Sequence, residues 1–264
     1  MTRTPAWLRL IVGIGALLLI APIGIIVIVS FGGDGYLKFP PSSLSLQWYE
    51  VFFGDGRWWD ALWASAIIAL VASLFSTTIG FLGAYVLVRS SSRFRTALLA
   101  LALTPMIVPQ VITAIAMFYV SSQLGLVGNL VWVSICHSVI ALPIVLLILL
   151  ATLRNIDPAL ERAAAGMGCS RLQTFRLVVI PLALPGVVSA ALFSFLASFD
   201  ELIISLFLTG VRTQTLPVKI WNSLLLEVEP TIAAVSTFLV AITVIVLLAD
   251  WAIRKASGTL ETGA

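Results

Sequence analysis

Charged residues are scarce in this sequence. Only 10% of its 264 residues are Asp, Glu, Lys or Arg, 60% are hydrophobic, and the mean hydropathy is +1.11. Soluble domains usually carry about 25% charged residues. So few charges on so apolar a chain exclude an ordinary water-soluble domain and indicate an integral membrane protein.

Residues that build metal sites, disulfides and active sites are scarce as well. The chain has two cysteines, Cys136 in an apolar run and Cys169 in a polar stretch, and one histidine, His137. These give neither a disulfide framework nor a metal-ligand spacing. No nucleophile and base form a constellation, which argues against an intramembrane enzyme. The chain also lacks a G-x-x-x-x-G-K-[ST] loop, so it cannot bind ATP through a P-loop of its own.

Long apolar stretches are abundant instead. A helix needs about 20 mostly apolar residues to cross a bilayer, and we predict an all-α membrane protein with six such helices. The expected spans are approximately 9–31, 62–88, 97–120, 129–151, 177–199 and 230–252. The first is too long for a signal peptide and lacks a small-x-small cleavage site before Gly32, so we interpret it as a retained span.

The distribution of Lys and Arg predicts the orientation, because cytoplasmic loops carry an excess of both. With both termini inside, eleven of the 15 basic residues are cytoplasmic, and the opposite topology reverses that ratio. We therefore expect an N-in, C-in arrangement. The inner set is Arg3, Arg9, Arg89, Arg93, Arg95, Arg154, Arg162, Arg171, Arg176, Arg254 and Lys255, and the outer set is Lys38, Arg57, Arg212 and Lys219.

The three outer segments differ in character. Residues 32–61 contain "GDGRWWDALW", whose tryptophans suit a membrane interface. Residues 121–128 are long enough only for a short turn. The third segment, 200–229, begins with the apolar run "ELIISLFLTG". We expect residues 200–215 either to re-enter the membrane or to cap the bundle.

The inner loop between spans four and five carries dense helix signals. Asp157 is a good N-cap, and Pro158 suits the first helical position. The apolar residues that follow have the i, i+3, i+4, i+7 spacing of one helix face. They are Leu160, Ala163, Ala164 and Met167.

A second helix is predicted directly after the first. Gly168 suits a C-terminal stop, and Ser170 with Gln173 forms a capping box for a helix that continues into the fifth span through Pro181. The first helix has only about ten residues, a length that is marginal alone in water. It therefore needs a surface. Its apolar face could dock in a groove of a partner protein, or its arginines could hold it on the anionic inner leaflet.

The spacing of this loop resembles the EAA loop of ABC importer permeases. In that family Glu-Ala-Ala is followed by three residues, Gly, nine residues and Ile-x-Leu-Pro. The matching positions here are Arg162, Ala163, Ala164, Gly168, Val178, Ile180 and Pro181. Arg162 stands where the family usually has Glu, and Glu161 directly precedes it.

The rest of the chain resembles the second permease subunit of spermidine/putrescine-type importers. The stretches concerned are "SLQWYEVFFGDGRWWDALWASAIIAL", "TTIGFLGAYVLVR", "SFDELIISLFLTG" and "TLPVKIWNSLLLEVEPTIAAVST". The resemblance implies a first helix and outer loop over 1–59, an ABC type-1 transmembrane domain over 60–250 and a cytoplasmic tail over 251–264. It implies as solute a polyamine or another small polar compound, such as an opine, a phosphonate or an amino-acid-like molecule.

The same resemblance implies partners and a location. A periplasmic or extracellular binding protein captures the solute, a second permease subunit completes a heterodimeric path across the bacterial inner membrane, and an ATPase dimer uses ATP and Mg²⁺. This chain itself binds no cofactor. The first helix of the inner loop, 158–167, would dock on the ATPase. The residues expected to couple are Leu160, Glu161, Arg162, Ala163, Ala164, Ala165, Met167 and Gly168.

Candidate solute-path residues lie at the outer end of the fifth span. Ser194, Ser198 and Glu201 have i, i+4, i+7 spacing, and Asp200 adjoins them. Ionisable groups at membrane depth usually serve function, although the acidic pair could also mark the water interface while the serines bond to their own helix backbone. Gln110 in the third span either lines the path or bonds to a neighbouring helix. In polyamine-type relatives we expect an acidic residue at this position.

Two other features have simpler interpretations. His137 lies in the fourth span with no second ligand nearby, as a hydrogen-bonded interior residue or a proton relay. Ser76, Gly80 and Ala84 form a small-xxx-small row that predicts close helix packing. The rival to an ABC permease is a self-sufficient proton-coupled transporter. The chain shows neither the inverted repeat nor the paired broken helices typical of such proteins.

Overall fold

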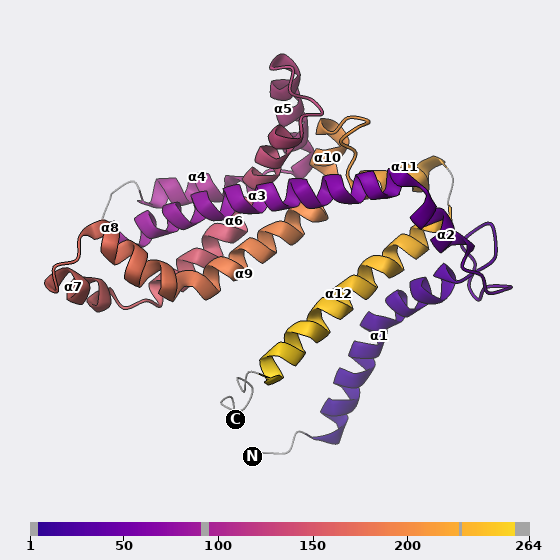
Figure 1. Cartoon of the computed structure of the whole chain (residues 1–264), viewed down its shortest axis with the longest axis horizontal. Helices are drawn as coiled ribbons and strands as arrows, with labels where there is room; N and C mark the ends of the chain where they lie inside the picture. Colours follow the sequence, from indigo (N-terminus) through magenta and orange to yellow (C-terminus); the bar gives the residue numbers. More distant parts are fainter. Residues whose placement is uncertain (1–4, 91–94, 227–228, 257–264) are drawn as a thin grey trace. The chain divides into compact units, whose positions relative to one another are not determined.

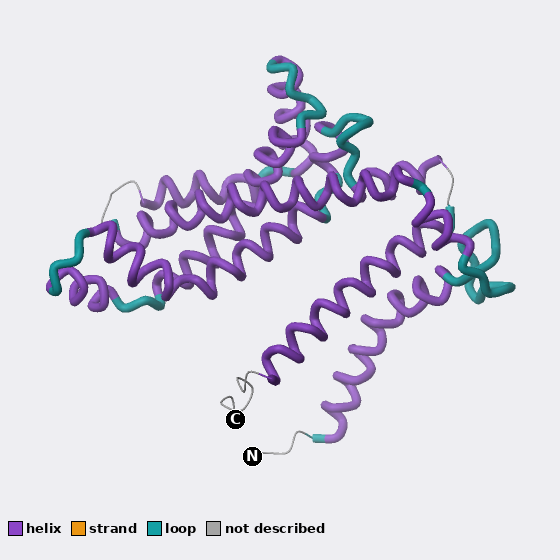
Figure 2. The backbone as a smooth tube through the Cα atoms, viewed as in Figure 1, coloured by secondary structure: helices purple, strands orange, loops and turns teal. Residues whose placement is uncertain are grey.

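The chain folds into helices. The computed structural model describes residues 5–90, 95–226 and 229–256, and for Ala6 and 246–256 it describes the backbone alone (Figure 1). Every regular element within these ranges is a helix (Figure 2), which confirms the all-α class. The helices are α1 (Ala6–Ser30), α2 (Gln47–Gly54), α3 (Gly56–Arg89), α4 (Arg95–Ile107), α5 (Gln110–Gln123), α6 (Leu130–Arg154), α7 (Pro158–Gly166), α8 (Arg171–Thr174), η1 (Phe175–Val179), α9 (Ile180–Phe199), α10 (Ile203–Leu208), α11 (Leu216–Leu226) and α12 (Thr231–Ala256).

Four helices in the described residues are long and apolar enough to cross a membrane. They are Trp7–Ser30 of α1, α3, α6 and the continuous helix Arg171–Phe199, which comprises α8, η1 and α9. The bent pair α4–α5 is a fifth if it counts as one span. The predicted sixth span falls on α12, whose described side chains form a shorter apolar helix that ends at Ile245. Six spans and the N-in, C-in orientation stay predictions.

The third predicted span, 97–120, is not one continuous helix. The axes of α4 and α5 differ by 101° across the break at Val108 and Pro109. Pro109 has no N–H to donate, and its ring disfavours helical backbone at the residue before it. Pro109 instead precedes α5 as its N-cap, with φ −54° and ψ 130°. The size of the bend depends on what the two halves pack against.

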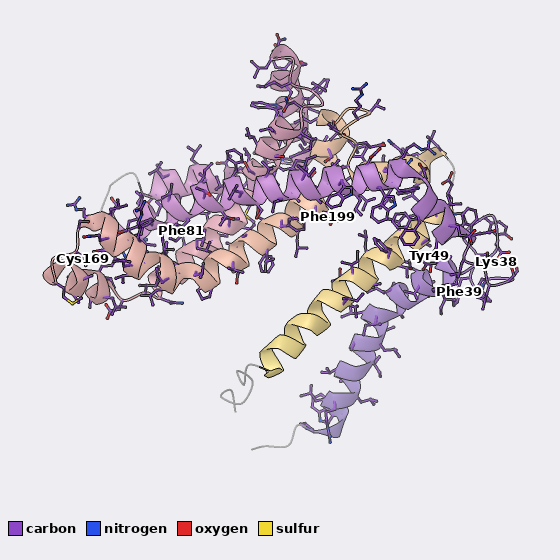
Figure 3. The ribbon with its side chains drawn as sticks, viewed as in Figure 1. Lys38, Phe39, Tyr49, Phe81, Cys169 and Phe199 are labelled. Atoms are coloured by element: carbon purple, nitrogen blue, oxygen red, sulfur yellow. The ribbon has the colours of Figure 1, made fainter. Side chains whose placement is uncertain are left out.

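By their contacts the helices form two compact units. One contains the chain up to Trp58 together with the segment from Ile220 onward, and the other is Trp59–Lys219. In the first unit α1 and α12 lie side by side and antiparallel (Figure 1). Tyr49 of α2, labelled in Figure 3, shares a hydrogen bond of 2.7 Å with Ser30 at the end of α1. The linear division at residues 59 and 250 stays a prediction.

Aromatic side chains join α2 to α12 in this first unit. The rings of Phe52 and Phe238 lie 5.2 Å apart, and Phe52 also meets the edge of Trp58. Phe52 and Trp58 are both buried. Trp58 is thus a core residue and not the interfacial anchor that its position in the tryptophan-rich outer loop predicted, whereas Trp63 is exposed.

In the second unit α6 is the central helix. It packs against α9 along much of its length and also against α4. Val145, Leu149 and Leu153 of α6 are buried with Val179 and Ala183 from the facing helix. A helix that is apolar on all sides belongs inside a bundle, and that position suits the sequence of α6.

Small residues let the helices of the second unit approach closely. A Cβ added to Gly80 of α3 would lie 2.6 Å from Cγ1 of Val145 on α6, and Ala84 is fully buried. Ser76, one turn earlier on α3, shares a 2.6 Å hydrogen bond with Ser194 of α9. These contacts confirm the close packing predicted from the Ser76, Gly80 and Ala84 row.

The apolar run after Glu201 forms the short helix α10. Ile204, Ser205 and Leu208 of α10 are buried, and the helix packs mainly on α5 and also touches α6. The Gly128 amide donates to the Leu208 carbonyl at 2.8 Å. This run therefore caps α5 and α6 within its unit, and membrane re-entry of 200–215 stays a prediction.

Replacing Gly80 by Ala should destabilise the second unit, because Val145 must move to admit the methyl group. Overpacking of this kind typically costs about 1–3 kcal/mol. Gly83→Ala is the matched control on the same helix, since its added Cβ meets its nearest neighbour, Leu146, at an ordinary 3.7 Å. Thermal unfolding of the purified protein in detergent measures both. Equal unfolding midpoints for the two variants would contradict the close α3–α6 contact.

Candidate functional site

The inner loop begins with a capped helix, as predicted. The Asp157 side chain accepts a hydrogen bond of 2.8 Å from the Ala159 amide, and Pro158 occupies the first helical position. Helix α7 has nine residues and ends at Gly166. An Asp cap satisfies an amide that would otherwise lack a partner at the helix start. The first helix predicted for this loop is therefore confirmed.

The bend and the second helix are also confirmed. Gly168 has φ +89°, a conformation that glycine adopts at little cost. Both hydrogen bonds of the capping box between Ser170 and Gln173 are present. Cys169, labelled in Figure 3, lies in the turn between α7 and α8. The helix then runs unbroken to Phe199, with the π-helical turn η1 just before Pro181, whose missing N–H disturbs the regular ladder.

The apolar face predicted for α7 is divided between two directions. Ala164 is buried against this chain, while Leu160 is 47% and Met167 80% exposed. Ala163 is exposed as well. Leu160, Ala163 and Met167 have i, i+3, i+7 spacing, so they form one outward apolar stripe. The remaining predicted coupling residues Arg162, Ala165 and Gly168 are also exposed.

Glu161, in contrast, is bound within this chain. Its carboxylate accepts a 2.7 Å hydrogen bond from Nε of Arg89 and a longer one, 3.3 Å, from the Tyr85 hydroxyl. Nη2 of Arg89 donates to the Ile156 carbonyl at 3.1 Å. The Glu161 and Arg89 side chains are only 17% and 18% exposed. The sequence offered no signal for this pair, because its members are 72 positions apart.

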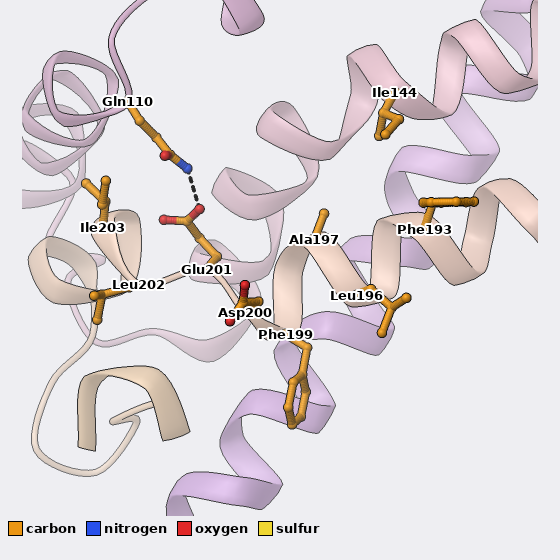
Figure 4. A pocket seen from close by; sticks show the side chains of 10 residues that line it. All are labelled: Gln110, Ile144, Phe193, Leu196, Ala197, Phe199, Asp200, Glu201, Leu202 and Ile203. Carbon is orange, nitrogen blue, oxygen red and sulfur yellow. Dashed lines mark hydrogen bonds between the residues drawn. The ribbon is translucent and has the colours of Figure 1, made fainter. Parts of the chain in front are cut away.

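An open pocket of about 870 Å³ lies at the end of α9 (Figure 4). The polar side chains that line it are Gln110, Asp200 and Glu201, and the others are apolar. The Gln110 amide donates to one oxygen of Glu201, as Figure 4 shows, and the other oxygen accepts from the Ile204 amide at 2.8 Å. Gln110 thus bonds to another segment, as one of its two predicted roles required, and it also lines this cavity.

The two serines of the predicted solute path lie elsewhere. Ser194 and Ser198 are buried between helices and are not among the residues that line the pocket. Ser194 bonds to Ser76 of α3, and Ser198 bonds to His137 of α6. The structure therefore brings Gln110, Asp200 and Glu201 together and separates them from both serines. A role of these residues in transport stays a prediction.

His137 links the two sides of the acidic turn. Its side chain is 1% exposed, with Nδ1 2.8 Å from the Ser198 hydroxyl and Nε2 3.2 Å from the Ser205 hydroxyl. Ser198 precedes Glu201 by three positions, and Ser205 follows it by four. The sequence predicted an interior hydrogen-bonded histidine as one of two possibilities, but gave no sign of its partners.

The helices and the capped inner loop together define a multi-pass membrane protein with a short capped helix between two spans. Residues 76–258 match the family described as "Binding-protein-dependent transport system inner membrane component", over more than half of the chain. The chain belongs to this family, and it is a permease subunit of an ABC importer.

Several curated relatives align over most of the chain. The spermidine/putrescine transport system permease protein PotC of Haemophilus influenzae is 29% identical over 89% of this chain and 91% of its own length. The putrescine transport system permease protein PotI of Escherichia coli is 28% identical over 94% and 90%. The sulfoquinovosyl glycerol transport system permease protein SmoH of Agrobacterium fabrum is 30% identical over 68% and 64%.

A solved structure shares the fold. A chain of a bacterial ABC transporter involved in import of the acidic polysaccharide alginate superposes with a TM-score of 0.69, covering 94% of each chain at 18% sequence identity.

His137→Leu should destabilise the protein, because it leaves two buried hydroxyls without a partner. Each such loss typically costs about 1–3 kcal/mol. The measurement is the thermal unfolding midpoint in detergent, compared in the wild-type and Ser205→Ala backgrounds. The drop should be smaller in the Ser205→Ala background, where one of the two hydroxyls is already absent. A variant that unfolds at the wild-type temperature but has lost transport would instead favour a proton relay.

Proposed function

We propose that this chain forms half of the solute path of a binding-protein-dependent importer and couples to a separate ATPase through the 157–181 loop. A second, different permease subunit forms the other half, and a periplasmic or extracellular binding protein delivers the solute. Membership of the family supports each partner by class. The proposed location is the inner membrane of a bacterium, with both termini in the cytoplasm.

The observation that carries the coupling role is the outward stripe on α7. The helix lies at one end of the second unit, where the α3 and α6 helices also end (Figure 1). Leu160 of α7 and its C-cap Met167 are exposed there, while Ala164 of the same helix is buried against this chain. A nine-residue helix whose exposed apolar stripe, Leu160 and Ala163, continues onto its C-cap Met167 fits a shallow groove of a protein partner.

The division of labour follows from what each partner contributes. The ATPase dimer would bind ATP and Mg²⁺, since this sequence has no P-loop. ATP-driven closure of that dimer would displace α7 and shift the bundle between inward-open and outward-open states. Such a switch requires the ATP-bound dimer and the loaded binding protein to favour one state over the other.

The lining of the pocket at the end of α9 supports the proposal that the transported solute is small and cationic or otherwise polar. Two carboxylates, Asp200 and Glu201, line it together with the neutral Gln110. Asp200 is exposed, whereas Glu201 is buried and already accepts hydrogen bonds from Gln110 and Ile204, and both carboxylates would attract an amine in the pocket. The polyamine systems named among the relatives favour a polyamine, and the sulfoquinovosyl glycerol system supports the wider class of small polar solutes.

Affinity purification of this chain in mild detergent, followed by mass spectrometry, should recover an ATPase and a second permease in stoichiometric amounts. Leu160→Asp with Met167→Asp should remove the ATPase and leave the second permease bound, because charges replace the apolar stripe of α7. Val211→Asp is the matched control, at a fully exposed valine in a different loop. A chain that purifies alone, and moves solute in liposomes without ATP, would establish the secondary transporter instead.

Glu201→Gln should lower uptake of radiolabelled putrescine or spermidine by about tenfold, since a carboxylate that lines the pocket contributes more than about 1 kcal/mol to an amine at contact distance. The solute binding protein and the complete transporter must be present in the assay. Glu50→Gln is the control for loss of an acidic residue, because Glu50 is exposed and outside the pocket. Polyamine uptake unaffected by Glu201→Gln would argue against a solute contact at this pocket.

A further inference from the structure

The C-terminal part of α3 contacts the inner loop on both sides of its bend. Before the bend, Arg89 and Tyr85 bind Glu161 of α7. After the bend, the rings of Tyr85 and Phe175 in η1 pack edge to face at a centroid distance of 5.0 Å, and the centroid of the Phe81 ring lies 5.7 Å from that of Phe175. One helix end therefore holds both arms of the loop.

Arg89 provides the polar part of this contact. Its guanidinium donates to two acceptors in different segments, the Glu161 carboxylate in α7 and the Ile156 carbonyl in the turn before α7. An isolated ion pair on an open surface contributes little. This pair is more than four-fifths shielded from solvent, and charge-assisted hydrogen bonds between shielded groups are stronger.

We propose that Arg89 is a positioning residue that fastens α7 to α3 through Glu161 and Ile156, so that displacement of α7 is passed directly to α3. The inference rests on the proposed coupling function and adds the element that receives the movement. A nine-residue helix has little stability of its own. Without this anchor a force applied to α7 would tilt it locally, and the bundle would stay in place.

Because of this anchor, the two charged residues of α7 contact different partners. Glu161 faces this chain and is occupied by Arg89, while Arg162 is exposed. Arg162 is therefore the charged residue of α7 that an ATPase would meet. Glu161, one position earlier, does not replace the glutamate that the family usually carries there, because its carboxylate is already bound by Arg89 within this chain.

The natural thiol of Cys169 reports on this anchor. Cys169 follows α7 directly, its amide bonds to the Ala164 carbonyl at 3.1 Å, and its side chain is half-buried. Release of α7 would break that turn and expose the thiol. The chain has two cysteines, so Cys136→Ala leaves Cys169 as the sole thiol. The measured quantity is the rate of maleimide alkylation of the purified full-length chain in lipid nanodiscs.

The test is a double-variant cycle of Arg89→Gln, Glu161→Gln and both together. Each single change leaves the other residue of the pair shielded from solvent without its opposite charge. It should raise the alkylation rate about threefold to tenfold. This is the range expected for loss of a partly screened hydrogen bond to a charged group. The alkylation rate of the double variant should be no higher than that of either single variant, because each single change already removes the ion pair. Arg162→Gln is the control and should leave the rate unchanged.

Two results would overturn the proposal. One is a wild-type alkylation rate in both single variants. The other is a double variant whose increase equals the product of the two single increases, since independent effects exclude a pair.

A second measurement separates this proposal from the coupling function itself. In the complete transporter, Arg89→Gln should keep the ATPase bound and hydrolysing ATP but lower solute transported per ATP. If Leu160→Asp with Met167→Asp releases the ATPase while Arg89→Gln transports with wild-type yield, coupling through α7 holds and the Arg89 anchor is wrong. If neither change affects the complex or its transport, the loop does not couple to the ATPase, and the Arg89 proposal, which rests on that coupling, is wrong as well.

Discussion

The structure depends on one constraint, which is that hydrocarbon offers no hydrogen-bond partner to a polar group. Helices satisfy the backbone of each span internally, and buried side chains must then find partners on other helices. Ser76 meets Ser194, and His137 meets Ser198 and Ser205. These bonds lie where α3, α6, α9 and α10 come together, so the same contacts that satisfy the polar atoms also specify which helices are neighbours.

The same constraint explains where the chain departs from straight spans. Pro109 interrupts the ladder between α4 and α5, and the break is tolerated because α10 packs against α5 beside it. The break places Gln110 at the start of α5, close enough to donate to Glu201. The break between α4 and α5 and the turn between α9 and α10 thus both contribute polar residues to the pocket at the end of α9. Broken helices that line a cavity are where membrane proteins usually place polar groups of functional importance.

At the other end of the bundle, the inner loop combines a fixed side with a free side. Caps at Asp157 and Ser170 and the left-handed Gly168 set the shape of the loop locally. Glu161 and Ala164 bind it to the chain, while Leu160 and Met167 stay exposed. The proposed coupling would need both properties, because a stripe with no anchor would move alone and an anchor with no stripe would contact no partner.

The sequence by itself determined the membrane class, most of the spans and the architecture of the inner loop, because apolar length, capping residues and glycine act over a few neighbouring positions. The family was recognisable from the same local spacing, which the match over residues 76–258 confirmed. Only the tertiary structure decided how far the third span bends, which face of α7 is free, and which polar residues meet. Arg89 and Glu161, or Gln110 and Glu201, are 72 and 91 positions apart. No local pattern records such pairs, since they arise from the way long helices pack.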